Sequence, residues 1–149
     1  SRKRAVLEMA EKMNETLRAG ESVLFFPEGT TGEGRLLLPF YANLFASAVA
    51  TEAELIPVVI RYTQKGKVTT IPSYAGNIPL FTVMKRIVFS SGLEAEVQGL
   101  EPISSAGVDR KTLCAQTSAV MSAALGVPDA TAAKEEAVRQ RREAALKHD

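Results

Sequence analysis

An unbroken apolar run that ends in a proline constrains the fold of this chain more than any other feature. Residues 22–26 read Ser-Val-Leu-Phe-Phe without polar alternation, which is typical of a strand buried on both faces of a parallel sheet. Pro27 ends this strand because proline has no N–H to donate to the ladder. Residues 28–35 then form a loop with three glycines. Ligands bind at the carboxyl ends of strands in open α/β sheets, so a site is expected directly after Phe26.

Strand and helix patterns alternate along the rest of the chain, which predicts one α/β domain. Pro57 indicates the start or the edge of a strand, and Lys65-Gly66 indicate a hairpin turn. Asp109 and Gly126 have the residue types of a helix N-cap and C-cap. The predicted helices are one that ends at Gly20 and those over residues 39–51, 79–89 and 109–125. The predicted strands are residues 22–26, 55–60, 68–71 and, at a sheet edge, 93–98.

Charge and residue counts limit the classes of function. The 149 residues hold 18 Lys+Arg and 17 Asp+Glu, and this net charge of +1 gives no reason to expect a nucleic-acid partner. Cys114 is the one cysteine and His148 the one histidine, which excludes an internal disulfide and argues against a metal site. The longest apolar runs are far shorter than the roughly 20 residues of a membrane-spanning helix. We therefore expect a chain in a reducing compartment that does not itself span a bilayer.

Residues 27–31, Pro-Glu-Gly-Thr-Thr, form the candidate binding loop. Gly29 lets a ligand approach the backbone, and Thr30 and Thr31 add hydroxyl groups and N–H donors. With the carboxylate of Glu28 they predict a site that binds a polar head group. Turn chemistry that only ends a strand explains the tetrapeptide about equally well when it is taken alone.

Three segments in order resemble motifs of one enzyme family. Phe-Pro-Glu-Gly-Thr at residues 26–30 resembles the third motif of the glycerolipid acyltransferases, the 1-acyl-glycerol-3-phosphate acyltransferase family. Ile-Pro-Val-Val at residues 56–59 resembles the fourth motif, and Leu-Leu-Pro-Phe at residues 37–40 resembles a stretch between the two. Residues 74–77 and the helix over 109–125 look like the rear of bacterial members. The resemblance covers residues 1–127, the C-terminal part of an acyltransferase domain, and leaves residues 128–149 as a charged, Ala-rich tail, helical or disordered.

The resemblance implies an α/β fold with a mixed, largely parallel sheet flanked by helices, incomplete at the N-terminus. It also implies acyl transfer, in which a His oriented by an Asp removes the proton of a lysolipid hydroxyl that attacks an acyl thioester. This His-x4-Asp pair is absent here, and His148 in the tail does not take its role. We expect the pair upstream of Ser1 and predict that this chain alone is inactive. Arg2 or Arg4 is a weak candidate for the trailing edge of the second motif, less favoured than a solvated basic helix start.

The resemblance also assigns roles in binding. Glu28, Gly29, Thr30 and Thr31 are the candidates that hold the acceptor lipid. The candidates for the acyl groove are Phe26, Pro27, Ile56 and Pro57, with Phe25, Phe45 and Val58 as further apolar neighbours, although core packing explains most of them better.

Two departures from the family pattern bear on the acceptor. Thr31 stands where many members have Arg, and residues 39–45 lack the Lys and Gly that many members have after Pro-Phe. Fewer cations weaken the case for lysophosphatidate, whose phosphate favours such charges. The similar bacterial acyltransferases of lyso-ornithine lipid would need fewer cations. Arg35 and Arg61 are possible substitutes, less favoured than ordinary surface or strand-end charges.

The resemblance implies no cofactor and no metal, with an acyl-CoA or acyl carrier protein thioester as co-substrate. The expected partners are a lysolipid acceptor, the thioester donor and a membrane surface, with no nucleic acid. We expect the protein at the cytoplasmic face of the inner membrane, peripheral or anchored through upstream residues, and residues 2–18 are the candidate amphipathic contact. The function that the resemblance implies is thus transfer of a fatty acyl group to a lysolipid such as 1-acyl-glycerol-3-phosphate, in phospholipid biosynthesis. The alternatives are a lyso-ornithine lipid O-acyltransferase and a noncatalytic lipid-binding module.

Overall fold

The computed structural model describes residues 2–76, 78–130 and 132. Most of the predicted tail over residues 128–149, His148 included, therefore lies outside the described residues. The helices are α1 (Arg2–Arg18), the short 3-10 helix η1 (Ala42–Phe45), α2 (Ala46–Thr51), α3 (Leu80–Val88) and α4 (Arg110–Leu125). The strands are β1 (Val58–Gln64), β2 (Lys67–Val68) and β3 (Leu93–Gly99). Helices and strands alternate in the chain, which confirms the α/β class.

The sheet has three strands in the order β2-β1-β3, and both pairings are antiparallel. The described residues thus do not form the largely parallel sheet that we predicted, and their one parallel pairing is an isolated bridge between Leu37 and Asp129. Antiparallel pairing follows from the connection of β1 and β2, because Lys65 and Gly66 both have positive φ angles, 50° and 75°, as a two-residue hairpin turn requires. The predicted hairpin is confirmed, although β2 ends at Val68 instead of Ile71.

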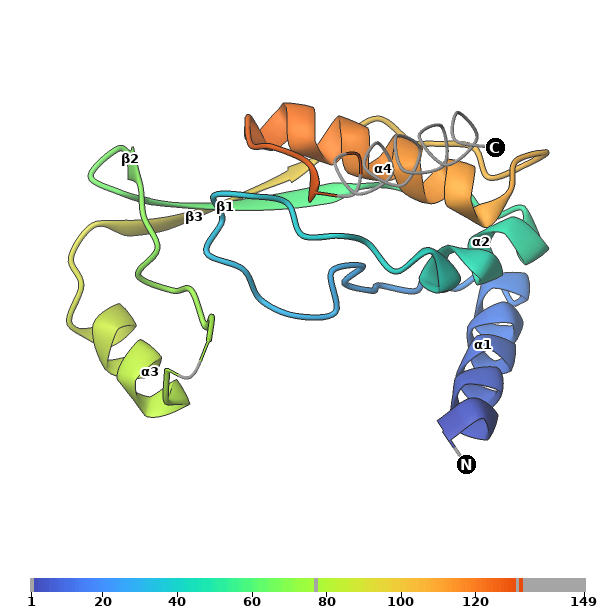
Figure 1. The fold of residues 1–149 in the computed structure, drawn as a ribbon, viewed down its shortest axis with the longest axis horizontal. Coiled ribbons are helices and arrows are strands. Elements are labelled where there is room, and N and C mark those ends of the chain that lie inside the picture. The colour runs from blue at the N-terminus through green and yellow to red at the C-terminus, as the bar shows by residue number, and fades with distance from the viewer. Residues whose placement is uncertain (1, 77, 131, 133–149) are drawn as a thin grey trace, which may run out of the picture.

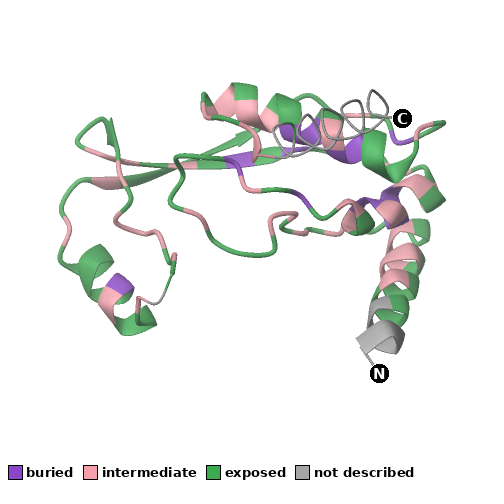
Figure 2. Cartoon of the chain, in the orientation of Figure 1, coloured by how far each residue is buried: buried purple, intermediate pink, exposed green. Residues whose placement is uncertain are grey.

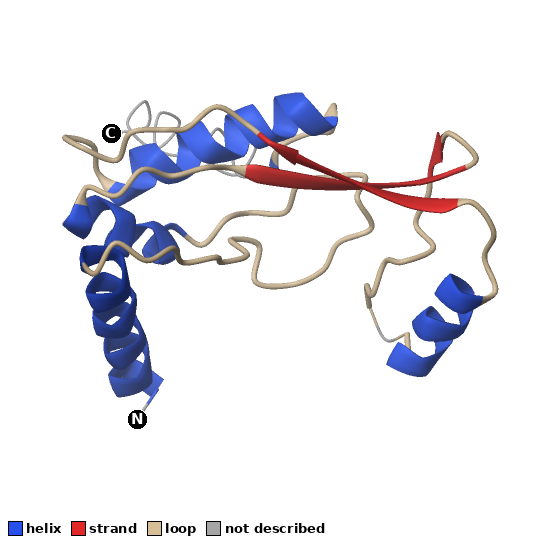
Figure 3. Ribbon diagram, turned by 180° about the vertical axis from the view of Figure 1, so that it is seen from behind, coloured by secondary structure: helices blue, strands red, loops and turns tan. Residues whose placement is uncertain are grey.

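α4 covers one face of the sheet and leaves the opposite face open (Figures 1 and 3). Along β1, Val59 is buried on the α4 side, whereas Val58 and Ile60 point the other way and are exposed. The predicted burial of this strand therefore holds for one face only. Among the described strands β3 pairs with β1 alone, which confirms its predicted place at a sheet edge.

The caps of α4 explain its sharp ends. Both Lys111 and Thr112 donate their N–H groups to one carboxylate oxygen of Asp109, at 2.8 and 3.3 Å, and the Thr112 hydroxyl donates to the other at 2.6 Å. Gly126 has φ 68° and donates its N–H to the carbonyls of Ser122 and Ala123. The predicted helix over 109–125 and both predicted caps are confirmed.

The core lies between η1, α2 and α4, where the buried residues gather (Figure 2). Phe45 and Leu113 are fully buried at its centre. The Phe45 ring stacks on the Phe40 ring with 6.3 Å between their centres, and it meets the Phe25 ring edge-on with 5.3 Å between their centres. The same core buries the Cys114 side chain, as expected for an unreactive thiol.

The described residues do not form the strand that we predicted over residues 22–26. These residues belong to no helix or strand, and Leu24 and Phe26 are 78% and 69% exposed. Only Val23 and Phe25 are partly buried, so the segment has one covered side. The lack of polar alternation suggested two buried sides, but none of the described strands pairs with this segment to supply them.

Two helix boundaries complete the comparison. α1 ends as predicted, with Gly20 in the left-handed region at φ 79°. The helix predicted over residues 39–51 begins only at Ala42, as η1, because Tyr41 before it is extended and packs against the candidate binding loop.

Candidate functional site

A tight turn follows residues 22–26 and places the candidate binding loop. The Gly29 N–H donates to the Phe26 carbonyl at 3.1 Å, which closes a turn around Pro27 and Glu28. Gly29 has φ 63°, a left-handed conformation that other residues adopt only with strain. The sequence Pro-Glu-Gly therefore fixes the direction of the Glu28 side chain through its local geometry.

The Glu28 carboxylate is held by the backbone of another segment. Leu38 donates its N–H to Oε2 of Glu28 at 2.9 Å. Partial burial raises the pKa of Glu28 above its ordinary value of 4.5, and the hydrogen bond from Leu38 opposes this change. Among the described residues Leu38 is the one donor to this carboxylate. Its second oxygen can thus accept a hydrogen bond from a ligand.

Tyr41 fastens the same turn from the other side. Its N–H donates to the Pro27 carbonyl at 2.9 Å. Its ring lies against Gly29, because a Cβ placed on Gly29 would come within 2.8 Å of Cε2 of Tyr41. The structure therefore joins residues 27–29 to residues 38–41, two of the three segments that resembled family motifs. Sequence reasoning noted Tyr41 only as a departure from the family pattern, and Pro39-Phe40 just before it was the available signal.

The rest of the loop is open to solvent and has one further anchor. Thr30 and Thr31 are exposed, as binding residues at a surface site can be. The Ser73 hydroxyl donates to the Gly32 carbonyl at 2.8 Å and ties the loop to residues 69–76. No pattern in the sequence predicted this contact, which joins residues 41 positions apart.

The four candidates for the acyl groove lie in different environments. Phe26 and Ile56 are exposed, Pro27 is partly buried, and Pro57 is buried just before β1. The Pro57 carbonyl accepts the Leu100 N–H at 2.9 Å. No hydrogen bond of the described residues joins Ile56 or Pro57 to the Glu28 turn, so the groove stays a prediction. The further candidates Phe25 and Phe45 pack in the core, as expected for most of these residues.

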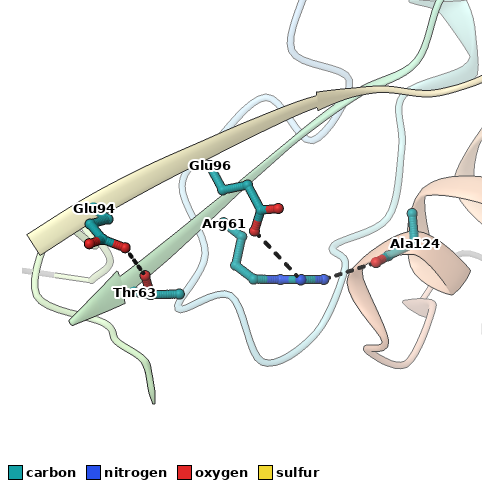
Figure 4. A network of polar contacts seen from close by, with 5 residues as sticks. All are labelled: Arg61, Thr63, Glu94, Glu96 and Ala124. Carbon is teal, nitrogen blue, oxygen red and sulfur yellow. Dashed lines mark hydrogen bonds and ion pairs between the residues drawn. The ribbon is translucent and has the colours of Figure 1, made fainter. Parts of the chain in front are cut away.

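Arg61 and Arg35 are engaged elsewhere. Nη2 of Arg61 donates to the Ala124 carbonyl at 2.9 Å, and Nη1 lies 3.9 Å from a Glu96 oxygen (Figure 4). The guanidinium thus binds the last turn of α4, where the helix dipole favours a cation. Arg35 is exposed and lies 3.9 Å from Glu33 in its own loop. These contacts favour the interpretation of Arg61 as a strand-end charge and of Arg35 as a surface charge.

The remaining sequence-based candidates give no second site. Nothing is described of the Arg2 and Arg4 side chains, and His148 lies outside the described residues. The described part of the chain has no group of His, Cys, Asp or Glu side chains suited to a metal ion. None of its helices combines the length and the apolar character needed to cross a membrane.

Comparisons with known proteins agree with this geometry. A family model described as Acyltransferase matches residues 1–61, which include the Glu28 turn and residues 38–41. The chain is 33% identical over 115 residues to the lyso-ornithine lipid O-acyltransferase of Pseudomonas aeruginosa, an alignment that covers 77% of this chain and 45% of that protein. It is 45% identical over 84 residues to the 1-acyl-sn-glycerol-3-phosphate acyltransferase of Neisseria gonorrhoeae, covering 56% of this chain and 32% of that protein.

A further lyso-ornithine lipid O-acyltransferase, from Brucella abortus, is 32% identical over 111 residues, which cover 65% of this chain and 42% of that protein. The chain thus spans less than half the length of each of these relatives. No solved structure matches it.

Proposed function

Since the chain belongs to the glycerolipid acyltransferase family, we propose that the complete protein transfers a fatty acyl group from an acyl thioester to the hydroxyl of a lysolipid. The observation that supports this most is the Glu28 turn, which fits an acceptor site. Its carboxylate is fixed by the Leu38 N–H and retains an oxygen for a ligand. A hydroxyl of the acceptor can donate to that oxygen, whereas a phosphate would be repelled by it.

The reaction needs groups beyond the acceptor site. A base takes the proton of the acceptor hydroxyl, the oxygen forms an ester bond with the thioester carbonyl, and the thiolate leaves. The base is proposed to be the His of a His-x4-Asp segment in the complete protein, because His148 is the one histidine of the 149 residues and does not belong to such a segment. The chain alone is accordingly proposed to be inactive, and the tests below use the complete protein.

The donor and the cellular place are parts of the same proposal. The donor is an acyl-CoA or an acyl carrier protein thioester, with no metal or other cofactor. The acceptor lies in a bilayer, so the protein works at a membrane surface, at the cytoplasmic face of the inner membrane. The family resemblance supports both points.

We also propose how the sheet continues in the complete domain. In the complete domain, residues 22–26 form a strand of a larger, largely parallel sheet. The exposed Leu24 and Phe26 support this, since a neighbouring layer would cover them. The parallel bridge between Leu37 and Asp129 supports it too.

A specific observation favours lyso-ornithine lipid over 1-acyl-glycerol-3-phosphate as the acceptor. Arg35 is paired with Glu33, Arg61 is bound to α4, and Thr31 brings no charge, so the described loop offers a phosphate few free cations. An ornithine head group carries an ammonium, which the Glu28 carboxylate can bind.

Thioester turnover by the complete protein tests these proposals. Lysophosphatidate and lyso-ornithine lipid are offered in parallel, and ester formation is followed by mass spectrometry. Faster ester formation with lyso-ornithine lipid supports the preferred acceptor, and faster formation with lysophosphatidate overturns that choice while leaving acyl transfer intact. Binding of both lipids without ester formation would favour the alternative of a noncatalytic lipid-binding module.

A further inference from the structure

α3 is an amphipathic helix whose apolar side faces solvent. At about 100° per residue, its apolar side chains occupy an arc of about 160°. These side chains are Leu80, Phe81, Val83, Met84, Ile87 and Val88. Val83 is the one that is buried, whereas Phe81 is 67% and Val88 73% exposed, as is Phe89 just after the helix at 82%. So much exposed apolar area on nine helical residues indicates a surface that binds something apolar.

The position of α3 leaves this side accessible. Figures 1 and 3 show the helix apart from α1, α2 and α4, at the end of the molecule where the β1–β2 hairpin also lies. None of the described helices or strands packs extensively against it. The Lys65 N–H donates to the Gly92 carbonyl at 3.1 Å, which fixes the hairpin turn to the residues that follow α3. Figure 2 shows most of α3 as exposed.

Both charged residues of α3 are cations, and the acidic residues Glu94 and Glu96 follow on β3. Lys85 and Arg86 lie in the polar arc of α3, and the Lys85 ammonium lies 5.0 Å from the centre of the Phe81 ring, at the border of the apolar arc. Residues 55–93 contain no Asp or Glu. They contain the cations Arg61, Lys65, Lys67, Lys85 and Arg86. This charge is local, because the whole chain has a net charge of only +1.

We propose that α3 is a membrane-docking helix that lies in the interface of an anionic bilayer, with its apolar arc among the acyl chains and Lys85 and Arg86 at the head groups. An apolar arc beside a basic face is the pattern of helices that bind the surface of anionic membranes. Lys85 at the border can extend its ammonium to the head groups while its stem stays in apolar surroundings. The inference rests on the proposed function in one respect, namely that a lysolipid acceptor is held in a bilayer.

The polar arc favours a membrane over a protein as the occupant. A purely apolar contact gives no use to the four exposed cations Lys65, Lys67, Lys85 and Arg86. An anionic lipid surface attracts these exposed cations, whereas Arg61 is bound to α4 and lies near Glu96. The sequence had indicated residues 2–18 as the membrane contact, so this proposal moves that contact to α3.

Environment-sensitive fluorescence on the complete protein tests the location. The fluorophore is attached to Val88→Cys, with Val97→Cys on exposed β3 as the matched control, and Cys114 is buried and little labelled. With phosphatidylcholine vesicles that contain phosphatidylglycerol, the label at position 88 is expected to shift to the blue, and the label at 97 is not. No response at position 88 overturns the proposal. A label at 88 that is already blue-shifted without vesicles also overturns it, because protein then covers α3.

Vesicle sedimentation tests the energetics. Phe81→Ser with Val88→Ser is expected to lower partitioning at least about tenfold, because both side chains lose their apolar burial. Lys85→Gln with Arg86→Gln is expected to lower it about tenfold on anionic vesicles at low salt and to have little effect at high salt. The matched control is Arg110→Gln with Lys111→Gln, an exposed basic pair on α4. If the control weakens binding as much as the α3 pair, general charge and not α3 attracts the protein, and the proposal is wrong.

Enzyme assays separate this proposal from the proposed function. The Phe81→Ser with Val88→Ser variant is expected to keep ester formation on a short-chain lysolipid in free solution and to lose it on vesicle-held lysolipid. A wild-type protein that shifts the label at position 88 but forms no ester contradicts the acyltransferase proposal alone. A wild-type protein that forms ester on vesicles without a response at position 88 contradicts the docking helix alone.

Discussion

Replacing Gly29 by alanine tests how the binding turn is held. Gly29 has φ 63°, and alanine in this left-handed region costs about 1 kcal/mol. The new methyl group also meets Cε2 of Tyr41 at 2.8 Å, so the ring must move. The ring is exposed and can turn outward, which limits this second cost to about 1 kcal/mol, the scale of an unfavourable rotamer. We therefore expect Gly29→Ala to lower the free energy of unfolding by about 2 kcal/mol.

The matched control is Gly34→Ala in the same loop. Gly34 has φ 74°, yet a Cβ there meets nothing within 4 Å. Gly34→Ala therefore loses only the free energy of holding alanine in the left-handed region. Urea unfolding, followed by circular dichroism, is measured for both variants with Tyr41 and with Tyr41→Ala. Removing the ring is expected to bring the cost of Gly29→Ala down to that of Gly34→Ala. Equal costs for the two glycines when Tyr41 is present would refute the packing of this ring on the turn.

Two further predictions concern the partly buried Glu28 and the buried Ser105. The raised pKa of Glu28 means that the folded protein holds this proton more tightly than the unfolded chain, so the stability from Glu28 is present below pH 4.5 and is lost as the pH rises through the raised pKa. Glu28→Gln keeps an acceptor for the Leu38 N–H without a charge. As the pH rises from acidic to neutral, the variant should gain stability relative to wild type. A difference in the free energy of unfolding that stays constant with pH in urea titrations would contradict the raised pKa of Glu28. The buried Ser105 hydroxyl lies 2.9 Å from the Ala48 carbonyl oxygen and 2.7 Å from that of Ala53. Ser105→Ala should therefore lower the free energy of unfolding by about 1–2 kcal/mol, measured by thermal or urea unfolding. Ser104→Ala, at the exposed neighbouring position, should lower it little.

Local signals in the sequence were enough to predict the elements that are stabilised locally. α4 begins and ends at residues whose side chain or left-handed φ caps it, and the hairpin turns at the two residues that can adopt positive φ. α3 was predicted from its apolar spacing, a periodic pattern of the helix itself. In each case the interactions that set the boundaries lie within a few residues of one another.

Pairing between distant segments was not predictable in the same way. Residues 22–26 look like a buried strand because they are apolar throughout, but a strand also needs neighbours, which the sequence does not name. The antiparallel sheet likewise depends on the register between β1 and β3, which joins Val58 to Gly99, 41 positions apart. Long-range choices of this kind are decided by packing and not by local propensity.

In the candidate site, too, local features were predictable and long-range contacts were not. Residue types and their order after the apolar run were enough to single out Glu28 and Gly29. The contacts that hold them come from the Leu38 N–H and from Tyr41, ten or more positions away. A backbone donor has no residue type of its own, so its role could not be predicted from the sequence.

The central claim is that the Glu28 carboxylate binds the lysolipid acceptor, and steady-state ester formation by the complete protein tests it most directly. The variants are Glu28→Ala and, as the matched control, Glu33→Ala, an exposed glutamate of the same loop. The account predicts that Glu28→Ala lowers kcat/KM for the acceptor at least about tenfold, as loss of a hydrogen bond to a charged group does, while Glu33→Ala stays near wild type. Equal activity of all three proteins would contradict the account.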